Sequence, residues 1–161
     1  MHNEYYEIVP GKLQKEIHQR KAIRLLEEEA TLNIMRTADH LNLQLMDVLK
    51  PYGLSGTQYN VLRILRGAGD TGASCKDIAG RMVTRDPDIT RLMDRLEKRG
   101  ILTRDRAKED RRVVTHRLTE SGLELVNELD RPIEALHQTA MGRLKSGQLR
   151  DLIDLLEQLR M

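Results

Sequence analysis

The sequence predicts a mainly helical fold that contains one small β-hairpin. Its 161 residues include no Phe, no Trp and only four Tyr, so aliphatic side chains and Met, which suit helix packing, must form the core. Charged residues make up 32% of the chain, which is typical of long amphipathic helices rather than of a β-sandwich. Two short stretches alternate as strands do, and a charged loop joins them.

The N-terminal third predicts an arm followed by long helices. Residues 1–11 end at a Pro-Gly pair, which marks a loop. The helical pattern then runs over residues 13–50, which is long for one helix, so we expect a break near residues 24–29. This segment holds more apolar positions than one buried stripe requires, and we therefore expect a second face that packs on another subunit.

Pro51 and Gly53 end this segment, and Ser55 or Thr57 caps the next helix. That helix has a strongly apolar face, made of Tyr59, Val61, Leu62, Ile64 and Leu65. After a glycine-rich loop, Ser74 caps a short helix that we expect to run to residue 82.

A second short helix is expected over residues 87–99. Asp86 supplies the cap acceptor and Pro87 suits the first turn. Four apolar residues at spacings i, i+3, i+4 and i+7 bury one face of this helix: Ile89, Leu92, Met93 and Leu96. Gly100 ends it in the left-handed conformation.

Two strands at 101–104 and 113–118 follow, joined by the charged loop 105–112. The last elements are helices over 119–142 and 147–160. The order is helices, a helix-turn-helix, a hairpin, and helices again.

The helix over 87–99 and the hairpin carry the pattern that points to function. With one face buried, the outer face holds charged residues: Asp88, Arg91, Asp94, Arg95, Lys98 and Arg99. Arg91 and Arg95 lie one turn apart on the same side. A helix fits the major groove of DNA, where Arg is the side chain that most often reads guanine.

The hairpin loop adds four cations that can reach phosphates or a minor groove: Arg106, Lys108, Arg111 and Arg112. Residues 71–122 hold 13 basic and 9 acidic residues, a net charge of +4, whereas the remainder carries −2. Positive charge is therefore concentrated where double-stranded DNA would bind. The pattern predicts a winged helix-turn-helix as a DNA-binding lobe at 51–122, preceded by an arm and subunit-packing helices at 1–50. The C-terminal helices at 123–161 are assigned to dimerisation by the family resemblance described below.

Other interpretations stay open at this point. The charges on residues 87–99 also fit a solvated face with local ion pairs, such as Asp94 with Arg91. The winged helix also fits a protein–protein interaction module without sequence-specific DNA binding, or a constitutive chromosome-binding protein. An enzyme is disfavoured because the sequence has no glycine-rich phosphate loop, no nucleophile elbow and no HExxH motif.

No cofactor or metal site is expected. The five histidines are scattered without helix ligand spacing, and we interpret His116 as a structural residue on the inner side of the hairpin. The single cysteine, Cys75, excludes an intramolecular disulfide and is interpreted as a small buried residue, with redox sensing as the alternative. We find neither a signal-peptide pattern nor a membrane span, and expect a cytoplasmic protein without membrane contact.

Residues from about 30 to 160 resemble the MarR family of bacterial regulators. The likeness runs through KPYGLSGTQYNVLRIL and ITRLMDRLEKRGILTR to the wing signature DRRVVTHRLTESG. This last motif is specific: a D-x-R, a strand, and then L-T-x-x-G at the start of a helix. The resemblance implies a homodimer shaped by its first and last helices, which places two winged lobes on one inverted-repeat operator. It also implies a repressor that a small amphipathic or phenolic effector, or oxidation, releases from DNA.

By position, the resemblance assigns recognition-helix residues that face bases and backbone: Arg85, Asp88, Thr90, Arg91 and Arg95. The four hairpin cations match the family's wing, and Asp110 matches the acidic residue that positions the wing arginine. The sequence departs from the family in two ways. The wing lacks the proline often found near its tip, and about 25 residues precede the usual family start. The residues that would bind an effector are not identified.

Overall fold

A computed structural model describes residues 12–84, 87–106 and 114–161 of the chain. Its backbone contacts divide the chain into two compact units, residues 1–43 and residues 44–161, and each is described by itself. The helices and strands of the described residues follow one another in this order: α1 (Lys12–Glu16), α2 (Leu26–Leu49), η1 (Lys50–Tyr52), α3 (Gly56–Ala68), η2 (Gly69–Thr71), β1 (Ala73–Ser74), α4 (Cys75–Arg81), α5 (Ile89–Lys98), β2 (Leu102–Arg106), β3 (Val114–Leu118), α6 (Glu120–Glu128), α7 (Asp130–Met141) and α8 (Ser146–Gln158).

The first unit contains α1 and most of α2. The expected break in the long N-terminal segment exists, but it covers residues 17–25 instead of the predicted 24–29, since α1 ends at Glu16 and α2 already begins at Leu26. Within this break Ile23 is buried, as is Leu13 of α1. Three glutamates occupy the first turn of α2, where the positive end of the helix dipole favours them.

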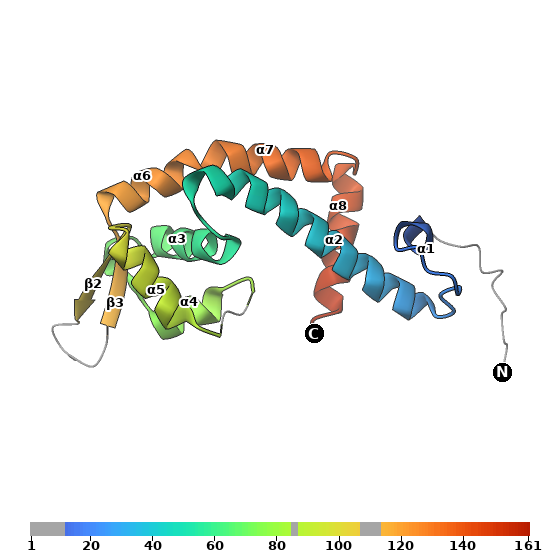
Figure 1. The fold of residues 1–161 in the computed structure, drawn as a ribbon, viewed down its shortest axis with the longest axis horizontal. Coiled ribbons are helices and arrows are strands. Elements are labelled where there is room, and N and C mark those ends of the chain that lie inside the picture. Colours follow the sequence, from blue (N-terminus) through green and yellow to red (C-terminus); the bar gives the residue numbers. More distant parts are fainter. Residues whose placement is uncertain (1–11, 85–86, 107–113) are drawn as a thin grey trace. The chain divides into compact units, whose positions relative to one another are not determined.

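The second unit is built around α3. Ser55 caps this helix, because its hydroxyl accepts from Gln58 N–H while the Gln58 side chain accepts from Ser55 N–H. The helix packs against α4, α6 and β3, and Figure 1 shows it among the other elements of this unit. Its predicted apolar face is confirmed, since all five residues named for it from the sequence are buried.

The sheet has three antiparallel strands in the order β1-β3-β2. The hairpin pairs Leu102 with Leu118 and Arg106 with Val114, so both strands lie about where the alternation predicted them. The two-residue strand β1 pairs Ala73 with His116. It was not predicted, because two residues are too few to show an alternation.

The start of α6 explains the L-T-x-x-G signature. Thr119 caps the helix by accepting from Gly122 N–H at 3.0 Å and donates its own hydroxyl to Gly100 O at 2.7 Å. A Cβ at Gly122 would lie 2.2 Å from the carbonyl oxygen of Ile101. The glycine therefore lets α6 approach the chain between α5 and β2, which ties the hairpin to the helices that follow it.

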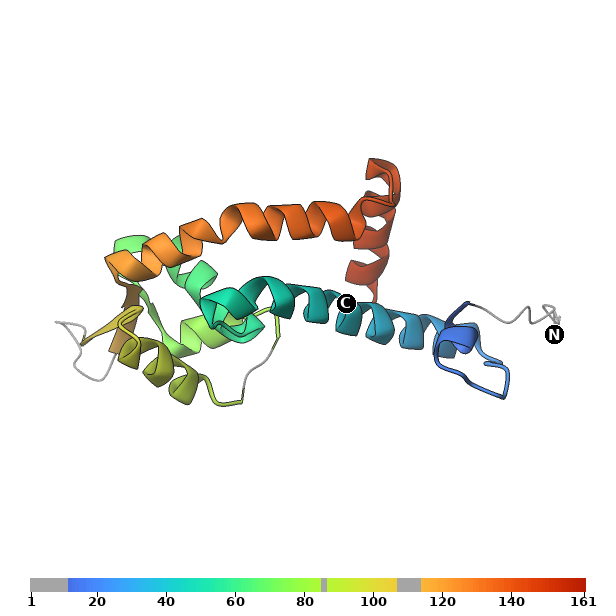
Figure 2. The ribbon, with the colours of Figure 1, turned by 45° about the horizontal axis from the view of Figure 1, so that its top comes forward.

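The prediction of one helix over 119–142 is wrong. The helix divides at Leu129 into α6 and α7, because Pro132 has no N–H to donate to the carbonyl of Glu128. Figure 2 shows α7 (orange) continuing from α6 and α8 (red) running across the end of α7. Helix α8 has 13 residues, none of them buried.

Replacing Gly122 with Ala should destabilise the fold by about 2 to 3 kcal/mol, because the new methyl group overpacks against the Ile101 carbonyl. Urea unfolding at one fixed protein concentration measures this change. Gly80→Ala in α4 is the matched control, since nothing lies within 4 Å of its Cβ position and the helix should gain roughly 0.5 to 1 kcal/mol. Equal stabilities of the two variants would contradict the packing described here.

Candidate nucleic-acid interface

The buried face of α5 is the one predicted from its apolar spacing, except that Ile89 is only half-buried. Leu92, Met93 and Leu96 are 7%, 2% and 0% exposed, so the helix is anchored along one side. The charged residues then take the outside, where the Arg91 side chain is 78% exposed. Thr90 and Arg95 are exposed as well. The helix thus presents a cationic outer face on a fixed apolar base.

Asp88 performs two roles at the start of α5. Its carboxylate accepts from Arg91 N–H at 3.4 Å, which caps the helix, and pairs with Arg91 Nε at 3.2 Å. The helix therefore begins at Ile89, two residues later than predicted, and the capping residue is Asp88 instead of Asp86. Asp86 and Arg85 lie outside the described residues. The local ion pair that the sequence suggested between Arg91 and Asp94 is instead made between Arg91 and Asp88.

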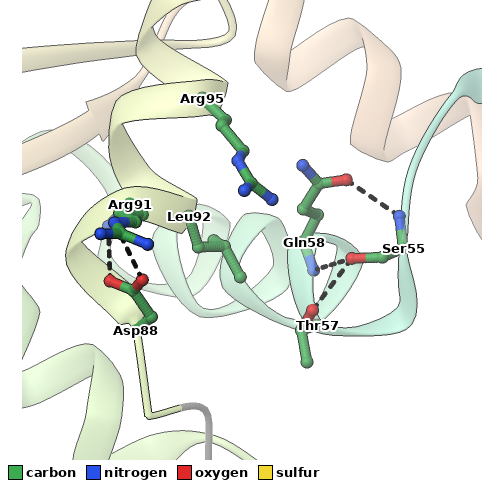
Figure 3. A pocket seen from close by; sticks show the side chains of 7 residues that line it. All are labelled: Ser55, Thr57, Gln58, Asp88, Arg91, Leu92 and Arg95. Carbon is green, nitrogen blue, oxygen red and sulfur yellow. Dashed lines mark hydrogen bonds and ion pairs between the residues drawn. The ribbon is translucent and has the colours of Figure 1, made fainter.

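A polar pocket separates α5 from the N-terminus of α3. Its lining comes from both helices: Ser55, Thr57, Gln58, Asp88, Arg91, Leu92 and Arg95. Figure 3 shows the Arg95 guanidinium pointing into this space towards Gln58. Two arginines and the positive end of the α3 dipole meet here, so the pocket favours an anion. We named Ser55 from the sequence as a candidate cap, a role that it fulfils with Gln58 in a capping box, but we did not predict that these residues line a pocket with α5.

Arg99 anchors the other end of α5. Its guanidinium donates to Gly53 O at 2.7 Å and to Tyr52 O at 3.1 Å. Gly53 has a φ of 62° and closes η1, so Arg99 joins the end of α5 to the turn that follows α2. We predicted Arg99 as an outer-face charge, but it is a structural donor.

The wing strands carry exposed cations that the sequence analysis did not name. Arg104 is exposed on β2, and Arg117 on β3 pairs with Asp105 at 3.5 Å. Arg106 ends β2. The other residues predicted for the wing lie outside the described residues: Lys108, Asp110, Arg111 and Arg112.

His116 and Cys75 lie where β3 packs against α4. His116 is 6% exposed, which confirms the predicted inner position, and its Nε2 lies 3.9 Å from Cys75 Sγ. Its Nδ1 is buried without a hydrogen-bond partner, so the ring makes fewer hydrogen bonds than we expected of a structural histidine. Burial lowers the pKa of His116, and nearby Arg104 lowers it further. Burial likewise raises the pKa of the Cys75 thiol, which favours the unreactive protonated form.

Within the described ranges, no three His, Cys, Asp or Glu side chains are grouped as a metal site. None of the helices in that part of the chain combines the length and apolar character that crossing a membrane requires.

A capped helix-turn-helix with a cationic second helix and an adjoining β-hairpin defines a winged helix-turn-helix protein. A family model described as the MarR family matches residues 54–114. The chain is also 39% identical to a MarR transcription factor from Planctomyces limnophilus, covering 84% of this chain and 98% of that one with a TM-score of 0.66. The chain therefore belongs to the MarR family and is a DNA-binding transcriptional regulator, not an enzyme.

Two further solved structures share the fold. The first is a mutant MarR from Escherichia coli in complex with operator DNA, at 23% identity and a TM-score of 0.74, covering 84% of this chain and 97% of that one. The second is BpsR from Bordetella bronchiseptica, whose DNA binding is regulated by 6-hydroxynicotinic acid. It is 22% identical with a TM-score of 0.73, covering 83% of this chain and 99% of that one.

The buried ring of His116 should make stability depend on pH. The pKa of His116 lies below 6.5 in the folded state. The contribution of the neutral ring to the free energy of unfolding is therefore fully present above pH 6.5 and is lost as the pH falls through the folded-state pKa. Between pH 7.5 and 5.5 this loss is at most about 1.4 kcal/mol. We expect His116→Gln to flatten that part of the pH profile in urea unfolding. The exposed His137→Gln should keep the wild-type profile, and an unchanged profile for His116→Gln would refute the assignment.

Proposed function

We propose that the chain is a homodimeric repressor that binds an inverted-repeat operator and leaves it when a small amphipathic or phenolic effector binds. In this proposal residues 51–122 bind DNA, and segments 1–50 and 123–161 join the two subunits. The protein acts in the cytoplasm, where it meets the chromosome.

The cationic outer face of α5 is the observation that carries the proposal. Its apolar base orients Arg91 and Arg95 outwards, and Asp88 holds the Arg91 guanidinium at the start of the helix. A side chain that is already oriented loses less conformational entropy when it binds a base edge. We assign base reading to Arg91 and a backbone contact to Arg95, which points into the pocket between α5 and α3. Contacts near the helix start are assigned to Arg85, Asp88 and Thr90.

Phosphate contacts come from two places in this proposal. The polar pocket between α5 and α3 suits one backbone phosphate, because Arg95 and the α3 N-terminus both favour an anion. The wing residues Arg106, Lys108, Arg111 and Arg112 approach the flanking backbone or minor groove, with Asp110 positioning the wing arginine.

The dimer is supported by α8. This helix buries none of its residues in the monomer. Its Ile153 and Leu155 are 53% and 60% exposed, and Leu159, which follows its last residue, is 71% exposed. An apolar helix face of this kind is stable in water when a second subunit covers it. Two-fold symmetry then places the α5 helices in successive major grooves, roughly 34–36 Å apart.

Repression and its release by an effector are supported by the relatives. The E. coli MarR mutant was solved on its operator, and the DNA binding of BpsR is regulated by 6-hydroxynicotinic acid. In our proposal the dimer blocks transcription while it occupies the operator, and the effector favours a lobe arrangement that no longer fits the DNA.

The salt dependence of DNA binding tests the number of phosphate contacts. With about four contacts per subunit, log K should fall with log salt at a slope near −7. Fluorescence anisotropy with a labelled duplex measures this slope. A slope shallower than about −2 on every duplex tested would rule out the proposed interface.

Arg91→Ala tests base reading. On the operator obtained by in vitro selection, we expect roughly 10- to 100-fold weaker binding, with little change on random duplex. Lys108→Ala should weaken binding to both duplexes about equally and make the salt slope shallower. Arg63→Ala, an exposed cation on α3 that is not among the proposed DNA contacts, is the control and should bind as the wild type does. Equal losses on operator and random duplex for Arg91→Ala would exclude base reading by this residue.

A further inference from the structure

We infer that Arg66 is a positioning residue that fixes the α6–α7 junction and thereby selects the half-site spacing that the dimer accepts. This inference rests on the proposed function, because it needs a dimer whose two lobes bind one operator. Arg66 lies in the last turn of α3, inside the proposed DNA-binding lobe and at the opposite end of this helix from the pocket with α5.

The Arg66 guanidinium binds four acceptors on the two helices of the junction. Its Nη1 and Nη2 each donate to one carboxylate oxygen of Asp130 at 2.9 Å. Nη1 also reaches Asn127 Oδ1 at 3.0 Å and Val126 O at 3.5 Å. Val126 and Asn127 belong to α6, whereas Asp130 is the first residue of α7. One side chain of the lobe therefore holds both helices.

A helix bends easily at the α6–α7 junction unless a side chain restrains it. Pro132 interrupts the backbone hydrogen bonds there, while Leu129 is completely buried and fixes the pivot point. The negative end of the α6 dipole faces the guanidinium, and Asp130 occupies the positive end of α7. Arg66 and Asp130 thus complement both dipoles, and the bidentate geometry restricts direction as well as distance.

The pair contributes more to orientation than to stability. The hydrogen bond from Arg66 lowers the pKa of Asp130, but the two side chains are 31% and 54% exposed. Partly exposed ion pairs add little to the free energy of unfolding. The lobe core does not include either charged group, so variants of this pair should fold.

The length of α7 amplifies a small change at this junction. Its 12 residues span about 18 Å, so a rotation of about 10° would move the far end by roughly 3 Å. That displacement is close to the rise of about 3.4 Å per base pair of DNA. Because α8 follows α7 and carries the proposed dimer face, each junction sets the separation of the two recognition helices.

The experiment measures binding to duplexes in which the half-sites of the selected operator are moved by −1, +1 or +2 base pairs. The full-length wild type, Arg66→Met, Arg66→Lys and the control Arg63→Met are compared. Arg63 is exposed on the same helix and lies over the Tyr59 ring. Dimerisation and binding to random duplex are measured alongside.

We expect the wild type and Arg63→Met to lose at least tenfold in affinity for a one-base-pair change. Arg66→Met should bind the selected spacing roughly tenfold more weakly and distinguish the spacings by less than threefold, with random-duplex affinity within twofold of wild type. Arg66→Lys keeps the positive charge but cannot form the bidentate hydrogen bonds of a guanidinium. Its affinity and its discrimination between spacings should lie between those of the wild type and of Arg66→Met.

If Arg66→Met proves too unstable, hydrogen exchange of Arg66→Lys and Asp130→Asn tests the same contact without DNA. Amides at Leu129 and Ile133 should exchange about tenfold faster, while those of α3 stay unchanged. The inference alone would be overturned if Arg66→Met kept the wild-type spacing profile, or if hydrogen exchange were unchanged in both milder variants. It would also be overturned if the wild type bound all spacings equally well. A wild type that binds no duplex would overturn the proposed function as well.

Discussion

The burial of α3 is the constraint on which the rest of the second unit depends. Val61 and Leu62 are completely buried in this helix, and Leu65 is nearly so. Helix α4, strand β3 and helix α6 all pack against it. Because aliphatic residues fill this core almost alone, its contacts depend on shape rather than on aromatic stacking. The position of each element that surrounds α3 is thereby fixed relative to the others.

This arrangement also explains why the charged residues of the lobe serve different purposes. Arg91 and Arg95 lie on the side of α5 that faces away from the core and remain available to an anion. Arg99 and Arg66 lie where helices end, and there they satisfy backbone carbonyls or side-chain acceptors. The residue type is the same in all four cases, and the position relative to a helix terminus decides the role.

The sequence was sufficient to predict the elements whose signals are local. Apolar spacing identified the buried faces of α3 and α5, and alternation identified the hairpin. The helix start at Asp88 was missed because Asp86-Pro87 also fits a capping pattern, and tertiary packing decides between the two. The division at Leu129 could have been predicted from Pro132, which we passed over within a long periodic segment.

The candidate site was predictable to a smaller extent. The outward position of Arg91 follows from its spacing to Leu92 and Leu96. The anchoring role of Arg99 depends on carbonyls about 46 residues earlier in the chain, and the bonds of Arg66 depend on residues 60 to 64 positions later. No local pattern reveals such pairs, since an exposed arginine and a bonded one have the same sequence signal.

The exposure of the apolar side chains of α8 in the monomer has an evolutionary consequence. No residue of α8 belongs to the core around α3, so selection for a stable lobe places no demand on Ile153, Leu155 or Leu159. In the dimer proposed above, a few substitutions on this face after a gene duplication would be enough to make two descendant proteins stop pairing with each other. New regulators with separate subunit pools can therefore arise without loss of the folded DNA-binding lobe.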